Sequence, residues 1–131
     1  MTIVARERRP VFDDCLAREA VAVLREHGSK RGAAVFGFCI MPEHVHLVVQ
    51  PGPGCDLVRF VGEYKNLVQR AWWAQGHSGL LWQRGFYDHF LRGEESLEGV
   101  VAYVLNNPVR RGLASDWREY AWCGSLALDL G

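Results

Sequence analysis

Two histidines, His44 and His46, stand two positions apart in the apolar segment HVHLVVQ (44–50). Side chains alternate along a strand, which would place both imidazoles on one face and Val45 and Leu47 on the other. Imidazole nitrogens are common ligands of divalent cations, so a same-face pair can form part of a metal site. The same spacing also occurs in histidines that simply lie on a solvated sheet face.

A second pair of polar side chains, Tyr103 and Asn107, lies four positions apart at the end of a segment with helical periodicity. Residues at this spacing share one flank of a helix. Asn107 comes directly before Pro108, where a helix ends and an amide is free of the helical turn. A phenol and an amide could thus face the histidine pair as nucleophile and ligand. A tyrosine of an amphipathic helix can equally pack its ring at the edge of the core.

These side chains need a framework of strands and helices, which hydrophobic periodicity and capping residues predict. In chain order, the predicted elements are a strand within 2–9, a helix from Asp13 or Asp14 to Gly28, strands over 32–40 and 44–50, a helix over 57–75, a strand around 87–90, a helix over 94–106, and an irregular or helical tail from about 114. This order is the split βαβ pattern of ferredoxin-like and RRM-like α+β folds. It predicts a four-stranded antiparallel sheet with helices on one face.

The length and charge limit what the chain can be. Its 131 residues suit a single domain over 1–131 with one core. Fifteen basic residues balance fifteen acidic ones, which argues against a protein that binds duplex DNA through bulk charge. The sequence contains no apolar run of the ~18 residues that a membrane helix needs, so no membrane partner is expected.

The four cysteines, Cys15, Cys39, Cys55 and Cys123, include no C-x-x-C pair, which disfavours a zinc knuckle. Without a recognisable signal segment, free thiols in a reducing cytoplasm are expected. We therefore expect a cytoplasmic protein.

Four motifs together resemble the single-tyrosine HUH transposases, and among them the REP-associated tyrosine transposases related to small insertion-sequence transposases. They are CIMPEHVHLVVQP (39–51), EYKNLVQRAWW (63–73), LWQRGFYDHFLR (81–92) and YVLNNPVRRGL (103–113). The similarity covers roughly residues 33–125 and keeps the order of the motifs. The resemblance implies an HUH-type version of the predicted fold, in a bacterial protein associated with the nucleoid when bound to DNA.

The resemblance also implies a site. His44, His46 and Asn107 would bind a divalent cation, Mg²⁺ or Mn²⁺, and Tyr103 would be the catalytic nucleophile. The enzyme would nick and transfer single-stranded DNA at hairpins or palindromic repeats such as REP elements, through a 5′-phosphotyrosine intermediate. Tyr64 is the rival nucleophile, because it also lies on a predicted helix and precedes Lys65.

Several basic and aromatic residues are candidates for contacting DNA phosphates, guanine edges or unpaired bases. They are Arg6, Arg8, Arg9, Lys65, Trp82, Arg84, Arg110 and Arg111, with Trp72 and Trp73 as further stacking candidates of which at least one should pack in the core. His89 is expected to have a structural role or to support a ligand.

Three expectations remain open at this level. Family members usually carry a longer segment before the first strand, so this strand is expected to be truncated. A homodimer that exchanges tyrosine helices is possible, as is a monomer. The alternatives to the transesterase are a catalytically inactive, domesticated nucleic-acid-binding module of the same fold and a simple metal hydrolase.

Overall fold

The computed structural model describes residues 1–88 and 95–128. The elements, in chain order, are β1 (Thr2–Val4), a 3-10 turn (Arg6–Arg8), α1 (Asp14–Lys30), β2 (Ala34–Met41), β3 (His44–Gln50), α2 (Leu57–Ala74), α3 (Leu97–Leu105), α4 (Asn107–Arg110), a second 3-10 turn (Trp117–Glu119) and β4 (Cys123–Gly124). Among the described helices, none is both long enough and apolar enough to cross a membrane.

The four strands form one antiparallel sheet in the order β1-β3-β2-β4. At its centre the hairpin of β2 and β3 pairs Met41 with His44 across a two-residue turn. On the other edge of β3, Thr2 of β1 lies opposite His46. The predicted α+β fold with a four-stranded antiparallel sheet is therefore confirmed.

The identity of the fourth strand differs from the prediction. β4 comes from the segment that was expected to be an irregular tail, and Cys123 lies opposite Cys39 of β2. The predicted strand near 87–90 contributes only an isolated bridge from Tyr87 to Thr2, and residues 89 and 90 lie outside the described residues. The tail becomes a strand because it pairs with the open edge of β2. No pattern of neighbouring residues indicates this long-range pairing.

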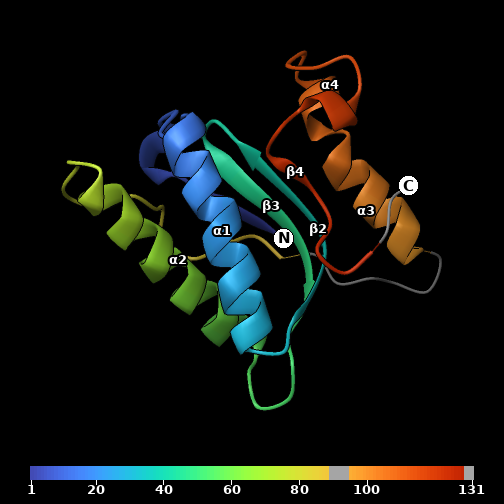
Figure 1. Ribbon diagram of the computed structural model, residues 1–131, viewed down its shortest axis with the longest axis horizontal. Helices are drawn as coiled ribbons and strands as arrows, with labels where there is room; N and C mark the ends of the chain where they lie inside the picture. The colour runs from blue at the N-terminus through green and yellow to red at the C-terminus, as the bar shows by residue number, and fades with distance from the viewer. Residues whose placement is uncertain (89–94, 129–131) are drawn as a thin grey trace.

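The helices are divided between the two faces of the sheet, as Figure 1 shows. α1 and α2 cover the face of Val45 and Leu47, which belong to the main apolar core. α3 lies on the other face, where Val104 packs with Cys39 and Met41 in a smaller apolar cluster. The expectation that all helices share one face is therefore wrong for α3. β2 is apolar almost throughout, so both of its faces need cover.

Side chains cap the three long helices at their first turns. The Asp13 carboxylate accepts a hydrogen bond from the Leu16 amide at 2.9 Å, and Asp56 does the same for α2. The Ser96 hydroxyl accepts from the Gly99 amide at the start of α3. Such caps satisfy amide groups that have no partner within the helix. The predicted start of the last helix at residue 94 lies outside the described residues.

Candidate active site on the histidine face of the sheet

His44 and His46 lie side by side on the face of β3 that α3 covers. Their ring centroids are 4.4 Å apart and the rings are nearly perpendicular. His44 is buried, with 6% of its surface exposed, whereas His46 is half-buried. The alternation of the strand thus brings both imidazoles to one place, beneath the helix that carries Tyr103.

Each imidazole has its Nδ1 atom engaged by a neighbour. His44 Nδ1 lies 3.0 Å from Glu43 Oε1, and its Nε2 lies 3.2 Å from Asn107 Nδ2. His46 Nδ1 lies 3.0 Å from the Thr2 hydroxyl of β1. The Nδ1 contacts fix the ring orientations, and the Nε2 atom of His44 faces Asn107.

Burial favours neutral forms of both histidines. It lowers the pKa of His44, although Glu43 opposes this effect. Burial, the adjacent His44 and the N-terminal amino group lower the pKa of His46 to about 3. Burial favours the neutral form of Glu43 as well, but Arg111 and His44 outweigh it and hold the pKa of this carboxyl below its usual range. The site therefore holds two neutral imidazoles and one carboxylate at neutral pH.

Tyr103 and Asn107 reach the site from a break between two helices. α3 ends at Leu105, and Asn106 forms the turn with its side-chain amide bonded to the Ala102 carbonyl at 2.9 Å. Asn107 begins α4, with Pro108 as the next residue. Asn107 is buried against His44, whereas Tyr103 is 65% exposed. The predicted helix end is thus a short turn that points the amide inward.

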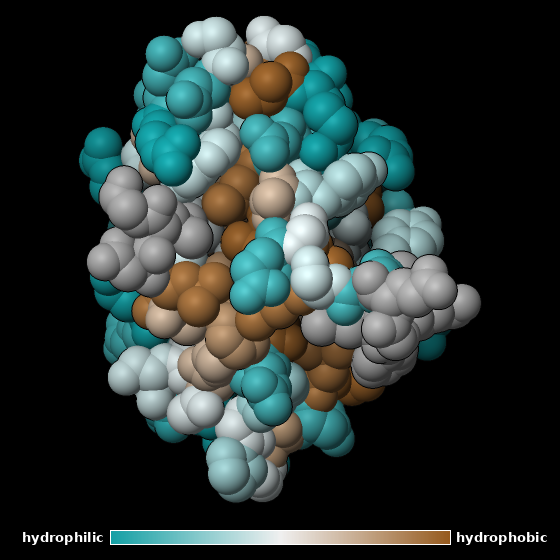
Figure 2. Space-filling model, turned by 90° about the vertical axis from the view of Figure 1, so that its right-hand side faces the viewer, coloured by the Kyte–Doolittle hydropathy of each residue, from teal (hydrophilic) through white to brown (hydrophobic). Residues whose placement is uncertain are grey.

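A cavity of about 610 Å³ separates the strand side of the site from the tyrosine helix. His46 and Thr2 line one side, and Tyr103 and Val100 line the other. Viewed from the side of α3, apolar surface runs in a band down the middle of this face between hydrophilic regions (Figure 2). The exposed phenol therefore opens onto the same space as the second histidine.

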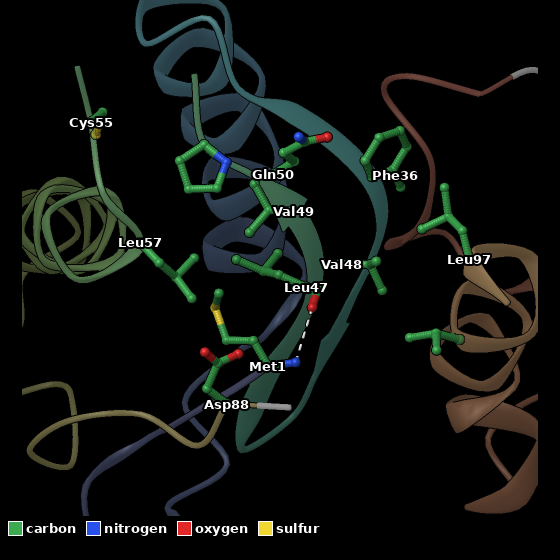
Figure 3. A pocket seen from close by; sticks show the side chains of 12 residues that line it. Met1, Phe36, Leu47, Val48, Val49, Gln50, Cys55, Leu57, Asp88 and Leu97 are labelled. Atoms are coloured by element: carbon green, nitrogen blue, oxygen red, sulfur yellow. Dashed lines mark hydrogen bonds between the residues drawn. The ribbon is translucent and has the colours of Figure 1, made fainter. Parts of the chain in front are cut away.

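A neighbouring cavity of about 630 Å³ shares Met1 and Val100 with the first. Figure 3 shows Leu97 on one side of it and Leu57 on the other, with Leu47, Val48 and Val49 of β3 between them. The Met1 amino group donates to the Leu47 carbonyl at 3.1 Å on the floor of this cavity. The two cavities are therefore neighbours with mainly apolar linings, and His46 lines the first of them.

The adjacent arginines predicted to bind DNA have different partners in the structure. The Arg110 guanidinium lies 3.7 Å from the centroid of the Tyr103 ring, and its Nη2 is 3.5 Å from Asn107 Oδ1. Arg111 Nη1 donates to Glu43 Oε1 at 2.7 Å. Both arginines therefore belong to the immediate surroundings of the histidines and the tyrosine.

Tyr64, the rival nucleophile, is fully buried between α1 and α2. Its hydroxyl donates to the Ala20 carbonyl at 2.9 Å, and burial raises its pKa. Tyr120 donates to the Ile40 carbonyl, and burial raises its pKa to about 12. Tyr87 is exposed, and its hydroxyl accepts from Gln83. Of the four tyrosines in the chain, only Tyr103 lines the cavity beside His46.

Two of the DNA-contact candidates have structural roles. Trp82 is 8% exposed, packs on Phe12 and donates its indole N–H to the Lys65 carbonyl. The prediction that its ring stacks on a base is therefore corrected, because the core covers the ring. The Lys65 ammonium donates to the carbonyls of Gln83 and Gly85, which hold the segment before the undescribed residues. Burial also lowers the pKa of Lys65.

The remaining candidates lie in the segment after β1, beside the bridge residue Trp82 and at the end of α2. Arg6, Arg8 and Arg84 are exposed. Arg9 donates to the Leu80 carbonyl at 2.7 Å and lies over the buried Trp72. Glu7 and Arg8 adopt left-handed backbone conformations, with φ values of 58° and 51°. Trp73 keeps 45% of its surface exposed.

Glu43 and Thr2 are site residues that sequence reasoning missed. Glu43 was interpreted only as part of the turn before the histidines, and Thr2 only as part of the first strand. The one available signal was the position of Glu43 directly before His44, which does not reveal its contact with Arg111. The described residues contain no cluster of three His, Cys, Asp or Glu side chains able to hold a metal. His89 lies outside the described residues.

The family described as "Transposase IS200 like" matches residues 1–107 of the chain. The chain belongs to this transposase family. The match includes His44, His46, Tyr103 and Asn107, and it ends before Arg110 and Arg111.

Individual relatives match the chain only in part. A Haemophilus influenzae protein with a provisional description as a REP-associated tyrosine transposase is 27% identical over 94 residues, covering 60% of this chain and 53% of the relative. An uncharacterized protein of the same organism is 27% identical over 96 residues, covering 55% of this chain and 52% of the relative. The chain thus spans about half the length of the curated relatives it matches.

A solved structure described as a REP-associated tyrosine transposase bound to a REP hairpin has the same fold. Its TM-score is 0.71, and the match covers 93% of this chain and 72% of the other. The sequences are only 18% identical over this match, so the similarity concerns the fold.

Proposed function

We propose that this IS200-like transposase nicks and rejoins single-stranded DNA at hairpin repeats, with Tyr103 as the nucleophile. The observation that carries the proposal is the arrangement of two helix residues against one strand. Asn107 contacts His44, and Tyr103, four positions earlier, opens onto the cavity that His46 lines. This arrangement supports the proposal, because His46 and Tyr103 line one cavity and Asn107 lies against His44.

The donor set fits a divalent cation. Two neutral imidazoles have Nε2 atoms available, and Asn107 provides an amide beside one of them. A half-turn of this amide about its Cβ–Cγ bond would exchange Nδ2 for Oδ1, the oxygen that can ligate a cation. Mg²⁺ or Mn²⁺ bound by His44, His46 and Asn107 would supply Lewis-acid polarisation of a phosphate oxygen.

Tyr103 would perform the covalent step. Its hydroxyl oxygen attacks the phosphorus of the scissile phosphodiester, and the bond from phosphorus to the 3′ oxygen breaks. The products are a 5′-phosphotyrosine and a DNA end with a free 3′-hydroxyl, which takes up a proton. Because Tyr103 is 65% exposed, solvent water can accept the phenol proton. The link conserves the phosphodiester bond, so attack by a 3′-hydroxyl can reverse it.

Charge and surface shape support a single-stranded substrate. Arg8, Arg110 and Arg111 all contribute positive potential at the histidines, which suits a phosphodiester. The mainly apolar cavities beside the site suit the faces of unstacked bases, which a duplex does not expose. That the DNA contains a hairpin, such as a REP element, is proposed from the relatives' descriptions.

The test is an incubation of the protein with Mn²⁺ and single-stranded hairpin oligonucleotides that carry palindromic repeats from the host genome. We expect a protein–DNA adduct that resists denaturation in wild type and is absent in Tyr103→Phe. An undiminished adduct in Tyr103→Phe would reject Tyr103 as the nucleophile. Hairpin binding without cleavage in several metals would favour the inactive binding module, and multiple turnover without an adduct would favour a metal hydrolase.

A further inference from the structure

Glu43 is a nearly buried carboxylate at the turn between β2 and β3, with 9% of its surface exposed. Its Oε1 atom contacts two side chains: His44 Nδ1 at 3.0 Å and Arg111 Nη1 at 2.7 Å. The first contact is with the neighbouring residue, whereas the second spans 68 positions of sequence. The turn before the histidines is therefore tied to the end of the tyrosine-bearing helices.

These contacts close a ring through α4. Asn107, the first residue of α4, contacts His44 Nε2, and Arg111, just after its last residue, contacts Glu43. The Arg111 amide also donates to the Asn107 carbonyl at 3.0 Å, so one helical turn fixes the spacing of the two side chains. His44 is consequently held at both ring nitrogens by groups that cannot shift independently.

We propose that Glu43, held in place by Arg111, is a positioning residue that sets the tautomer and orientation of His44. A neutral imidazole carries one N–H donor and one acceptor nitrogen, and a carboxylate can only accept. Glu43 therefore keeps the proton on Nδ1 and leaves the lone pair of Nε2 facing Asn107 and the proposed cation. The Asn107 Nδ2 contact at 3.2 Å agrees, because an amide N–H donates to such a lone pair. The inference rests on the proposed function for its metal.

The other histidine shows why this role belongs to Glu43. His46 Nδ1 contacts the Thr2 hydroxyl, which can either donate or accept a hydrogen bond and so does not select a tautomer. Glu43 therefore selects a tautomer at His44, whereas the Thr2 hydroxyl selects none at His46.

A second cluster of one glutamate, one arginine and one histidine provides a control for the role of Glu43. Glu63 on α2 is an ion-pair partner of Arg31 and lies 3.7 Å from His27 Nε2. It thus joins a histidine and an arginine as Glu43 does, but between α1 and α2 and away from the histidine face. Loss of Glu63 removes its ion pairs with Arg31 and Arg59, and loss of Glu43 removes the ion pair with Arg111. Only loss of Glu43 alters the environment of His44.

The experiment compares wild type, Glu43→Gln, Arg111→Met and Glu63→Gln in two measurements. Long-range ¹H–¹⁵N NMR of the metal-free proteins, at about pH 8 where imidazoles are neutral, reports the tautomer of His44. Electron paramagnetic resonance of unbound Mn²⁺ reports the dissociation constant without any DNA. Circular dichroism and thermal unfolding show that each variant is folded.

We expect wild-type His44 to be protonated at Nδ1. In Glu43→Gln the amide can donate as well as accept, so His44 should become a mixture of tautomers, and Mn²⁺ should bind about 10- to 100-fold more weakly. Arg111→Met should show a smaller change in the same direction, and Glu63→Gln should match wild type in both measurements.

An unchanged His44 tautomer in Glu43→Gln, or equal Mn²⁺ weakening in Glu63→Gln, would overturn the inference. If Glu43→Gln does not fold, Arg111→Met provides the test. An unchanged His44 tautomer and an unchanged Mn²⁺ affinity in Arg111→Met would then overturn the inference. The tautomer measurement needs neither metal nor DNA. A wild type that forms no DNA adduct but loses the Nδ1 proton in Glu43→Gln would therefore reject the proposed function and retain the positioning role.

Discussion

Asn107 Nδ2 lies 3.2 Å from His44 Nε2, although 63 positions of sequence separate the two residues. The contact joins the first turn of α4 to the central strand of the sheet and is almost fully buried. The contact also places Tyr103 near the histidines, because only Asn106 separates α3, which contains Tyr103, from α4. The pairing of strand and helix at this contact underlies the predictions that follow.

Tyr64→Phe separates the two candidate nucleophiles. The variant loses only the hydroxyl that donates to the Ala20 carbonyl inside the core. We expect the free energy of unfolding to fall by roughly 1 kcal/mol, with an undiminished yield of DNA adduct. Denaturant unfolding and the adduct assay measure the two effects. Loss of the adduct from a folded Tyr64→Phe protein would favour Tyr64 over Tyr103.

His46→Ala should remove an imidazole from the proposed cation site. We expect Mn²⁺ binding, measured by calorimetry, to weaken by at least about 100-fold, beyond the cost of losing an outer hydrogen-bond partner. His77→Ala is the control, because His77 is exposed after α2 and stacks on Trp72. Equal binding by His46→Ala and wild type would exclude His46 as a ligand.

Gly52→Ala should destabilise the loop that follows β3. An added Cβ would lie 2.4 Å from the Arg31 carbonyl oxygen and 2.6 Å from that of Gly32, so the two loops must separate. We expect a loss of about 1–3 kcal/mol in the free energy of unfolding.

Gly62→Ala provides the comparison, because its Cβ would meet nothing within 4 Å inside α2. This variant should gain roughly 0.5–1 kcal/mol, since alanine favours helix over glycine. Urea unfolding of both variants measures the free energy of unfolding. A Gly52→Ala protein as stable as wild type would contradict the prediction, because the two loops could then separate without cost.

Glu7→Gly should stabilise the protein, because Glu7 has a left-handed backbone conformation with φ 58° and ψ 22°. This conformation costs a non-glycine residue about 1–2 kcal/mol, part of which glycine loses again through its larger unfolded-state entropy. A net gain of up to about 1 kcal/mol is expected in thermal or urea unfolding. Glu19→Gly, at an exposed position within α1, should instead lose about 1 kcal/mol. A loss in both variants would contradict the strain at Glu7.

The sequence alone determined the features that depend on neighbouring residues. Alternation along 44–50 placed His44 and His46 on one face, and Asp13 was one of the two residues predicted to cap the start of α1. The four-residue spacing of Tyr103 and Asn107 predicted their shared flank. These signals are local, because strand alternation, capping and helical spacing each involve residues within a few positions.

Tertiary structure decided the features that depend on distant partners. β4 exists because Cys123 and Gly124 reach the open edge of β2, and α3 lies on the histidine face because Val101 and Val104 meet the second apolar side of that strand. Trp82 joined the core. Arg111, one of the DNA-contact candidates, pairs with Glu43, 68 positions away. Nothing near these residues in sequence marks such pairings, since they arise only when the chain folds back on itself.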